Sequence, residues 1–114
     1  MPAKVEALDG GAQGHEALTA ITTVKTFTST LYAPTTGAFA GRRAKAALIT
    51  VETAAIRFTL DGTTPVVTAT GGGVGHEMKA DQSYRILGSD NIAGFQCINE
   101  TNANGAVVRV TFFF

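Results

Sequence analysis

The chain has 114 residues, of which 45% are hydrophobic and 16% are charged, and its nine basic side chains balance its nine acidic ones. A chain of this length predicts a single domain with a core of its own. A net charge of zero lacks the basic surplus on which nucleic-acid binding depends, so we expect no nucleic-acid partner.

The apolar segments are too short to span a bilayer, and no basic amphipathic helix is visible, so we expect no membrane association. The first residues, Met-Pro-Ala-Lys-Val-Glu, lack the apolar segment of a signal peptide, which predicts a protein made in the cytoplasm. The single Cys97 excludes an internal disulfide and a cysteine-based zinc site. So few surface charges suggest that a partner covers part of the surface.

Residues 1–16 are predicted to form an N-terminal arm, followed by a single β-sandwich domain over residues 17–114. The arm contains one proline and three glycines, and its apolar anchors are Val5 and Leu8. Such a terminus is either mobile or ordered on a neighbouring subunit, and the sequence leaves both interpretations open.

The next segment, residues 18–32, is rich in threonine and β-branched side chains. This composition favours one long strand with a bulge, or two short strands, over a helix. Residues 33–37 are predicted to form a loop. Arg42 and Arg43 then make a basic cluster with Lys45, which is either a solvated surface or a contact for an acidic partner.

Two alternating segments in the middle of the chain are predicted to organise the core. The apolar side chains have odd numbers in residues 47–51 and even numbers in residues 56–60. This change of parity predicts a turn near residues 52–55 that lets both segments face one interior. We expect the two segments to form a β-hairpin that ends at Asp61-Gly62.

Short strands separated by turns are predicted for the rest of the chain. A glycine-rich loop is expected at residues 71–75 and a turn at Asn102–Gly105. The expected strands cover residues 66–70, 76–79, 84–87, 92–99 and 106–114.

The last of these strands has two different faces. Val108, Val110, Phe112 and Phe114 are predicted to point into the core, and Phe113 to point away from it. An outward Phe113 is either an ordinary exposed aromatic or part of a subunit interface.

Strands at intervals of about 8–12 residues with turns between them predict an all-β protein, an antiparallel β-sandwich. About eight strands fit a jelly-roll-like arrangement.

Residues with catalytic or metal-binding chemistry are few. His76 stands beside Glu77, but the other histidine is His15 in the predicted arm, and these residues do not complete a metal ligand set. The glycine-rich segment lacks the following helix and the Lys-Ser or Lys-Thr of a phosphate-binding loop. We expect no metal and no cofactor.

Cys97 alternates with predicted core residues, which indicates a buried small hydrophobe rather than a nucleophile. The carboxylates are scattered, and the sequence leaves open whether two of them meet as a catalytic pair or several bind a calcium ion. We expect that the protein is not an enzyme. These carboxylates are Asp61, Glu77, Asp81, Asp90 and Glu100.

Five segments, taken in order, cover most of the chain from Ala44 to Phe114. They are residues 46–52, residues 56–65 with the ending Asp-Gly-Thr-Thr-Pro, residues 75–83 beginning Gly-His-Glu-Met, residues 91–95, and the strand after Gly105. Together they resemble small β-sandwich virion proteins encoded in the head and tail gene blocks of tailed bacteriophages.

This resemblance implies a structural role as a capsid cement or decoration protein, or as a part of the head–tail joint. The implied partner is the major capsid protein, the implied location is the capsid surface of the virion, and a homo-oligomer, dimer or trimer, is expected. The candidate contact residues are Val5, Leu8, Arg42, Arg43 and Phe113.

Two other classes of function remain open. One is a carbohydrate- or host-surface-binding module of a phage tail or adhesin, which would need an exposed aromatic platform. The other is a small β-barrel enzyme, which would need His76 and a carboxylate to converge in a pocket.

Overall fold

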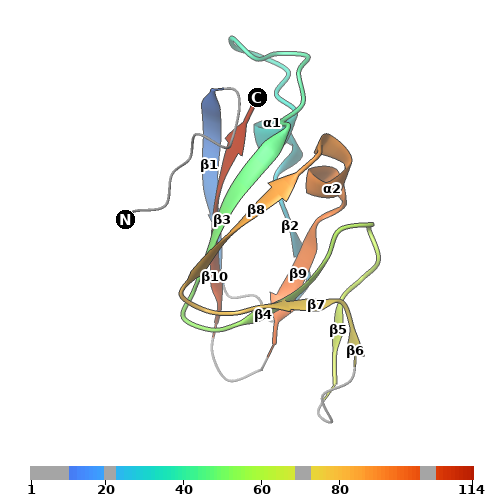
Figure 1. Ribbon diagram of the computed structural model, residues 1–114. Helices are drawn as coiled ribbons and strands as arrows, with labels where there is room; N and C mark the ends of the chain where they lie inside the picture. The colour runs from blue at the N-terminus through green and yellow to red at the C-terminus, as the bar shows by residue number, and fades with distance from the viewer. Residues whose placement is uncertain (1–10, 20–22, 69–72, 101–104) are drawn as a thin grey trace.

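The computed structural model describes residues 11–19, 23–68, 73–100 and 105–114, and within these ranges it contains ten strands and two short helices (Figure 1). No helix in the described ranges is long and apolar enough to cross a membrane. The helices are α1 (Ser29–Tyr32) and α2 (Ser89–Gly94). The strands are β1 (Ala12–Leu18), β2 (Lys25–Thr26), β3 (Ala46–Glu52), β4 (Ile56–Thr59), β5 (Val66–Val67), β6 (Gly73–Val74), β7 (His76–Met78), β8 (Gln82–Leu87), β9 (Gln96–Asn99) and β10 (Val107–Phe113).

Eight of the strands form two four-stranded sheets, in the orders β1-β10-β3-β8 and β2-β9-β4-β7. All pairings are antiparallel, and they are nested: β1 pairs with β10, β2 with β9, β3 with β8, and β4 with β7. This nested order across two layers is that of a jelly roll, so the predicted all-β antiparallel sandwich is confirmed. The count exceeds the expected eight because β5 and β6 pair separately as a two-stranded extension.

The predicted central hairpin is wrong in its pairing. β3 pairs with β10 and β8, whereas β4 pairs with β9 and β7, so the two segments lie in different sheets. Thr53 has a φ of +77°, and the Ala54 N–H donates to the Glu52 carbonyl at 2.9 Å, as the chain crosses between the layers. A change of parity requires only that both segments face one interior, and an arch between facing sheets meets that requirement as well as a hairpin does.

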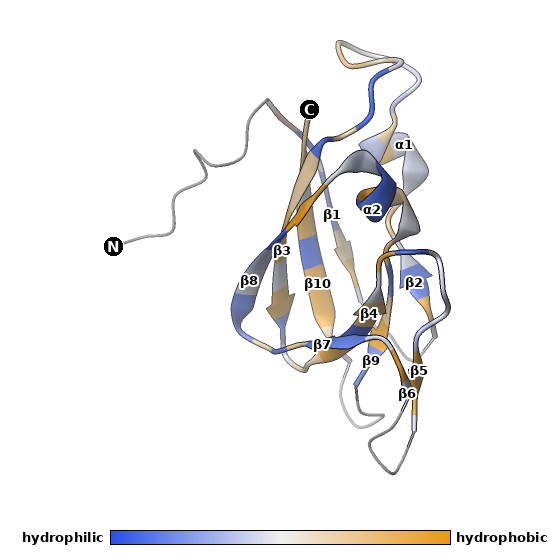
Figure 2. Cartoon of the chain, turned by 45° about the vertical axis from the view of Figure 1, so that its right-hand side comes forward, coloured by the Kyte–Doolittle hydropathy of each residue, from blue (hydrophilic) through white to orange (hydrophobic). Residues whose placement is uncertain are grey.

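The interior between the sheets is where the predicted core faces meet. Ile49, Val51 and Ile56 are fully buried, as are Val108 and the other inward side chains of β10, which confirms the predicted core. Figure 2 shows β10 as mainly hydrophobic, interrupted by a hydrophilic band. Aromatic rings fill the centre: Phe27 stacks on Phe95 with ring centroids 4.3 Å apart and meets Phe112 edge-on at 5.3 Å.

Helices replace two segments that were predicted to be strands. Among its described residues after Leu18, the end of β1, the segment 18–32 contains the short β2 followed by α1, and residues 92–94 belong to α2. Both helices place apolar side chains on the core, Leu31 and Tyr32 from α1 and Ile92 from α2. The packing of these side chains on the core outweighs the β propensity of the segments.

The predicted boundary between the arm and the domain, after residue 16, falls inside β1. His15 faces Thr111 of β10, with its Nδ1 3.1 Å from the threonine hydroxyl, and Glu16 accepts hydrogen bonds from the Thr28 backbone and hydroxyl at 2.8 Å. The sandwich therefore includes the residues from Ala12 onward. Residues 1–10, and residues 102–104 of the predicted turn, lie outside the described residues.

The first prediction concerns the aromatic centre of the core. We expect Phe95→Ala to lower the free energy of unfolding by about 3–5 kcal/mol, because it removes a fully buried ring and leaves a cavity. Leu87→Ala is the control, since this side chain is 60% exposed and its loss should change stability by less than about 0.5 kcal/mol. Urea denaturation of both variants gives the comparison, and equal losses would contradict the assigned interior.

Candidate functional site

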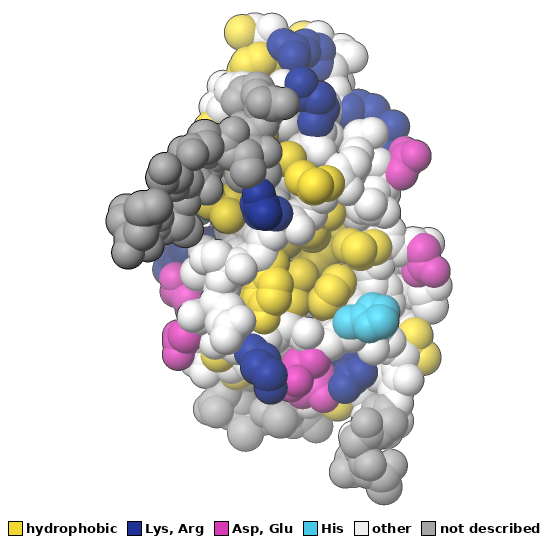
Figure 3. Space-filling view, viewed as in Figure 1, with side chains coloured by type: hydrophobic (Ala, Val, Ile, Leu, Met, Phe, Trp, Pro, Cys, Tyr) yellow, Lys and Arg dark blue, Asp and Glu magenta, His cyan; other side chains and the backbone are white. Residues whose placement is uncertain are grey.

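One side of the sandwich is open between the edge strands β8 and β7. Each of these strands ends its sheet, and the register Phe58↔His76 places β7 beside β4. Phe58 and Tyr84 pack against the core but stay only partly buried. Figure 3 shows hydrophobic side chains gathered in a hollow on this face, next to a histidine and above a row of charged groups. This side therefore presents apolar surface to solvent.

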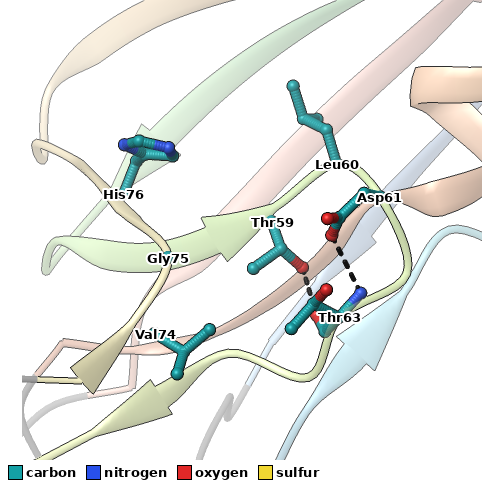
Figure 4. Close-up of a pocket in the computed structure, with 7 residues that line it drawn as sticks. All are labelled: Thr59, Leu60, Asp61, Thr63, Val74, Gly75 and His76. Carbon is teal, nitrogen blue, oxygen red and sulfur yellow. Dashed lines mark hydrogen bonds between the residues drawn. The ribbon is translucent and has the colours of Figure 1, made fainter.

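A pocket of about 360 Å³ lies at the end of β4, beside this opening. Figure 4 shows one side formed by the segment that joins β6 to β7, and the other by the end of β4 and the loop that follows it. The described residues that line the pocket are Thr59, Leu60, Asp61, Thr63, Val74, Gly75 and His76.

The loop after β4 is held by hydrogen bonds within itself. The Thr63 N–H donates to Asp61 Oδ1 at 3.0 Å, and the Thr59 hydroxyl donates to the Thr63 carbonyl. An aspartate that accepts from the N–H two residues later forms an Asx turn, which explains why Asp-Gly ends the strand here. The carboxylate is thus fixed at the rim of the pocket.

Helix α2 supports the same loop from behind. The Gly62 N–H donates to the Gly94 carbonyl at 3.1 Å, and the Gln96 side-chain amide donates to the Gly62 carbonyl at 3.0 Å. A Cβ on Gly94 would collide with the Leu60 carbonyl, so glycine is required at the end of α2 for this approach. The pocket wall is therefore part of the rigid sandwich.

The opposite side is fixed by Arg57 of β4. Its guanidinium donates to both carboxylate oxygens of Glu100, at 2.9 and 2.8 Å, and to the Gly75 carbonyl at 2.9 Å. The two side chains are only 16% and 20% exposed, which makes this bidentate pair more stabilising than an open surface pair. Gly75 has a φ of +113°, and a Cβ there would lie 2.6 Å from the Phe58 carbonyl, so only glycine fits between Val74 and His76.

The pocket carries one permanent charge. Hydrogen bonds from Thr63, first from its backbone N–H and then from its hydroxyl, hold the pKa of Asp61 below its ordinary value. The carboxylate is therefore ionised at neutral pH and accepts hydrogen bonds without donating any. Among the described lining residues none is Lys or Arg, so the pocket favours cations or neutral donors over anions.

The predicted chemical groups do not converge on this site, apart from His76 and Asp61. The His76 ring lies 5.9 Å from the Phe58 ring, while Glu77 pairs with Lys79 at 3.4 Å. Across the described ranges no three His, Cys, Asp or Glu side chains are grouped closely enough to hold a metal ion. Cys97 is fully buried, as predicted, and burial raises its pKa to about 12, so the thiol stays protonated.

The two predicted arginine contacts are engaged within the chain. Arg42 lies over the Phe39 ring, 4.9 Å from its centroid, and donates to the Phe114 carbonyl at 3.3 Å. Arg43 pairs with Asp90 at 3.2 Å on the exposed surface. These contacts fix the orientation of both side chains without burying them.

Phe113 points away from the main core, as predicted, but it is only 7% exposed. It packs in a small cluster with Ala46 and Leu48 on the outer side of its sheet. The ring therefore offers little surface to a partner. Val5 and Leu8, the other predicted contacts, lie outside the described residues.

Sequence reasoning missed the pocket and the exposed surface beside it. Asp61 was interpreted as a turn former, which it is, but the same turn places its carboxylate at the rim. Val66 and Val74 face each other across β5 and β6 and are 44% and 41% exposed. The sequence signal that could have indicated this exposed surface was the presence of Val66 and Val74 on either side of the glycine-rich segment.

Comparison with known proteins returned nothing for this chain: no protein-family model, no curated protein and no solved structure matches it.

The second prediction follows from the lowered pKa of Asp61. A depressed pKa in the folded state stabilises the fold above the ordinary value of 3.8, and this contribution is lost as the pH falls through the lower folded pKa. Asp61→Asn keeps the acceptor for Thr63 but removes the charge. We expect the stability difference between wild type and this variant to shrink as the pH falls below 3.8.

Urea denaturation in a pH series measures this difference. Asp81→Asn is the matched control, because Asp81 is exposed in the turn before β8 and has no ion-pair partner among the described residues. A difference for Asp61→Asn that stays constant with pH would show that Thr63 does not stabilise the charged carboxylate.

Proposed function

We propose that this protein is a structural component of a tailed-phage virion, a capsid cement or decoration protein that bridges subunits of the major capsid protein. The proposal is supported by the resemblance of residues 44–114 to such proteins and by the jelly-roll sandwich, an architecture used in viral capsid proteins. Its location on the capsid surface is part of the same proposal.

The observation that carries the proposal is the extension formed by β5 and β6. These strands belong to neither four-stranded sheet, and their facing valines, Val66 and Val74, are both more than 40% exposed. Figure 2 shows this extension as a hydrophobic element at the end of the molecule away from α1 and α2. Two exposed β-branched side chains on a projecting strand pair favour contact with another protein.

The extension is anchored so that a contact at Val66 and Val74 is transmitted to the sandwich. Pro65, just before β5, is fully buried, and Arg57 holds the Gly75 carbonyl just after β6. A rigid, pre-organised contact loses little conformational entropy when it binds. A protein that bridges capsid subunits needs such a pre-organised contact.

Bridging stabilises a shell because buried area adds up over many copies. A contact of standard size buries about 800 Å² on each partner, and several contacts on one capsid bind by avidity. A dimer or trimer of this chain would multiply the contacts further. Arg42 and Arg43 stay candidate contacts for acidic capsid surface, because both are exposed.

The third prediction tests the extension. We expect the double variant Val66→Asp and Val74→Asp to bind capsids assembled from the major capsid protein of the same genome at least about tenfold more weakly, because it buries two carboxylates in an apolar contact. Co-sedimentation with purified capsids measures the binding. The matched control is Thr30→Asp with Ala93→Asp, which adds the same charge at exposed positions of α1 and α2.

Two outcomes would count against the proposal. If the wild-type protein does not sediment with the capsids, the virion role is wrong. If the valine variant binds as tightly as the control variant, the extension is not the contact.

A further inference from the structure

We propose that the pocket beside β4 receives a lysine or arginine side chain of the partner protein. The charged end of that side chain binds the Asp61 carboxylate, and its aliphatic stem lies against Val74. The source of the side chain rests on the proposed function, whereas the preference of the pocket for a basic group does not.

The charge of the pocket supports this assignment first. Asp61 is ionised, and one of its oxygens accepts the Thr63 N–H at 3.0 Å, which fixes its orientation. A carboxylate accepts about four hydrogen bonds in all, so it has acceptor capacity left for an ammonium or guanidinium group. Among the described residues lining the pocket no basic side chain neutralises this charge.

The walls of the pocket supply the second argument. Val74 presents its methyl groups on the side of Thr59 and Thr63 (Figure 4). The imidazole of His76, which also lines the pocket, lies 5.9 Å from the Phe58 ring. Lysine and arginine bury their methylene stems along apolar surface while the charged end stays polar. A volume of about 360 Å³ leaves room for one such side chain.

The third argument is continuity with the exposed valines. Val74 both lines the pocket and forms half of the exposed pair with Val66. A partner that covers the valines therefore also covers the mouth of the pocket. Excluding water there strengthens the ion pair, which is how a central charged residue becomes a dominant contact in an interface.

Two other ligand classes fit less well. An anion would meet the ionised Asp61 without a neighbouring cation in the described lining. A saccharide needs several converging hydrogen-bonding groups on its hydroxyls, and here the Thr59 hydroxyl is already donated to the Thr63 carbonyl.

The fourth prediction tests the pocket on the full chain in solution. The ¹⁵N-labelled protein is titrated at low salt with N-acetyl-lysine N-methylamide, with the uncharged N-acetyl-norleucine N-methylamide, and with methyl glucoside. We expect the lysine probe to shift the amide signals of Leu60, Asp61, Thr63 and His76, with an affinity about threefold higher than that of the norleucine probe.

Variants assign this preference to the carboxylate. Asp61→Asn should bring the lysine probe to the affinity of the norleucine probe, because it removes the charge and keeps the acceptor for Thr63. Asp90→Asn should leave the preference unchanged. Thermal denaturation of each variant confirms that it is folded.

The proposal is overturned if lysine and norleucine probes bind alike, if no probe shifts these signals, or if Asp90→Asn abolishes the preference as well. Tighter binding of methyl glucoside would assign the pocket to a saccharide instead. Because no capsid is present in the titration, its failure is distinct from the failure of capsid binding.

Discussion

The burial of one shared interior between two four-stranded sheets is the constraint on which the rest of the molecule depends. Phe27 and Phe95 stack at its centre, and Phe112 of β10 closes the cluster from the facing sheet. This packing fixes β4 and β9 relative to β3 and β10. The pocket and the extension are both built on the end of β4, so their geometry follows from the same interior.

Rigidity at the candidate site comes from contacts that bring distant segments together. Arg57 joins the end of β9 to the junction of β6 and β7 through Glu100 and Gly75, while α2 supports the loop that carries Asp61. Neither side of the pocket is an isolated loop. This arrangement suits recognition of a preformed surface, because the site does not have to order itself on binding.

The sequence predicted which faces are buried better than it predicted which strands are partners. The parity of Ile49, Val51 and Ile56 located the interior correctly, since a period of two specifies a face. The parity could not distinguish a hairpin from an arch, because both put the same faces inward.

The helices were missed because their short segments contain β-branched residues, and only the packing of Leu31 and Ile92 reveals the helical turns. The pocket could not be predicted from the sequence, because its two sides come together only when β7 pairs with β4 in the register Phe58↔His76. The hydrophobic pattern does not specify that pairing.

The most direct test of the account is whether β3 and β4 lie in different sheets. Nuclear Overhauser effects between backbone protons report strand pairing in solution. The account predicts cross-strand effects between the partners Ile49 and Val110, and between Phe58 and Cys97. Effects that connect residues 47–51 with residues 56–60 as a hairpin ladder would contradict it.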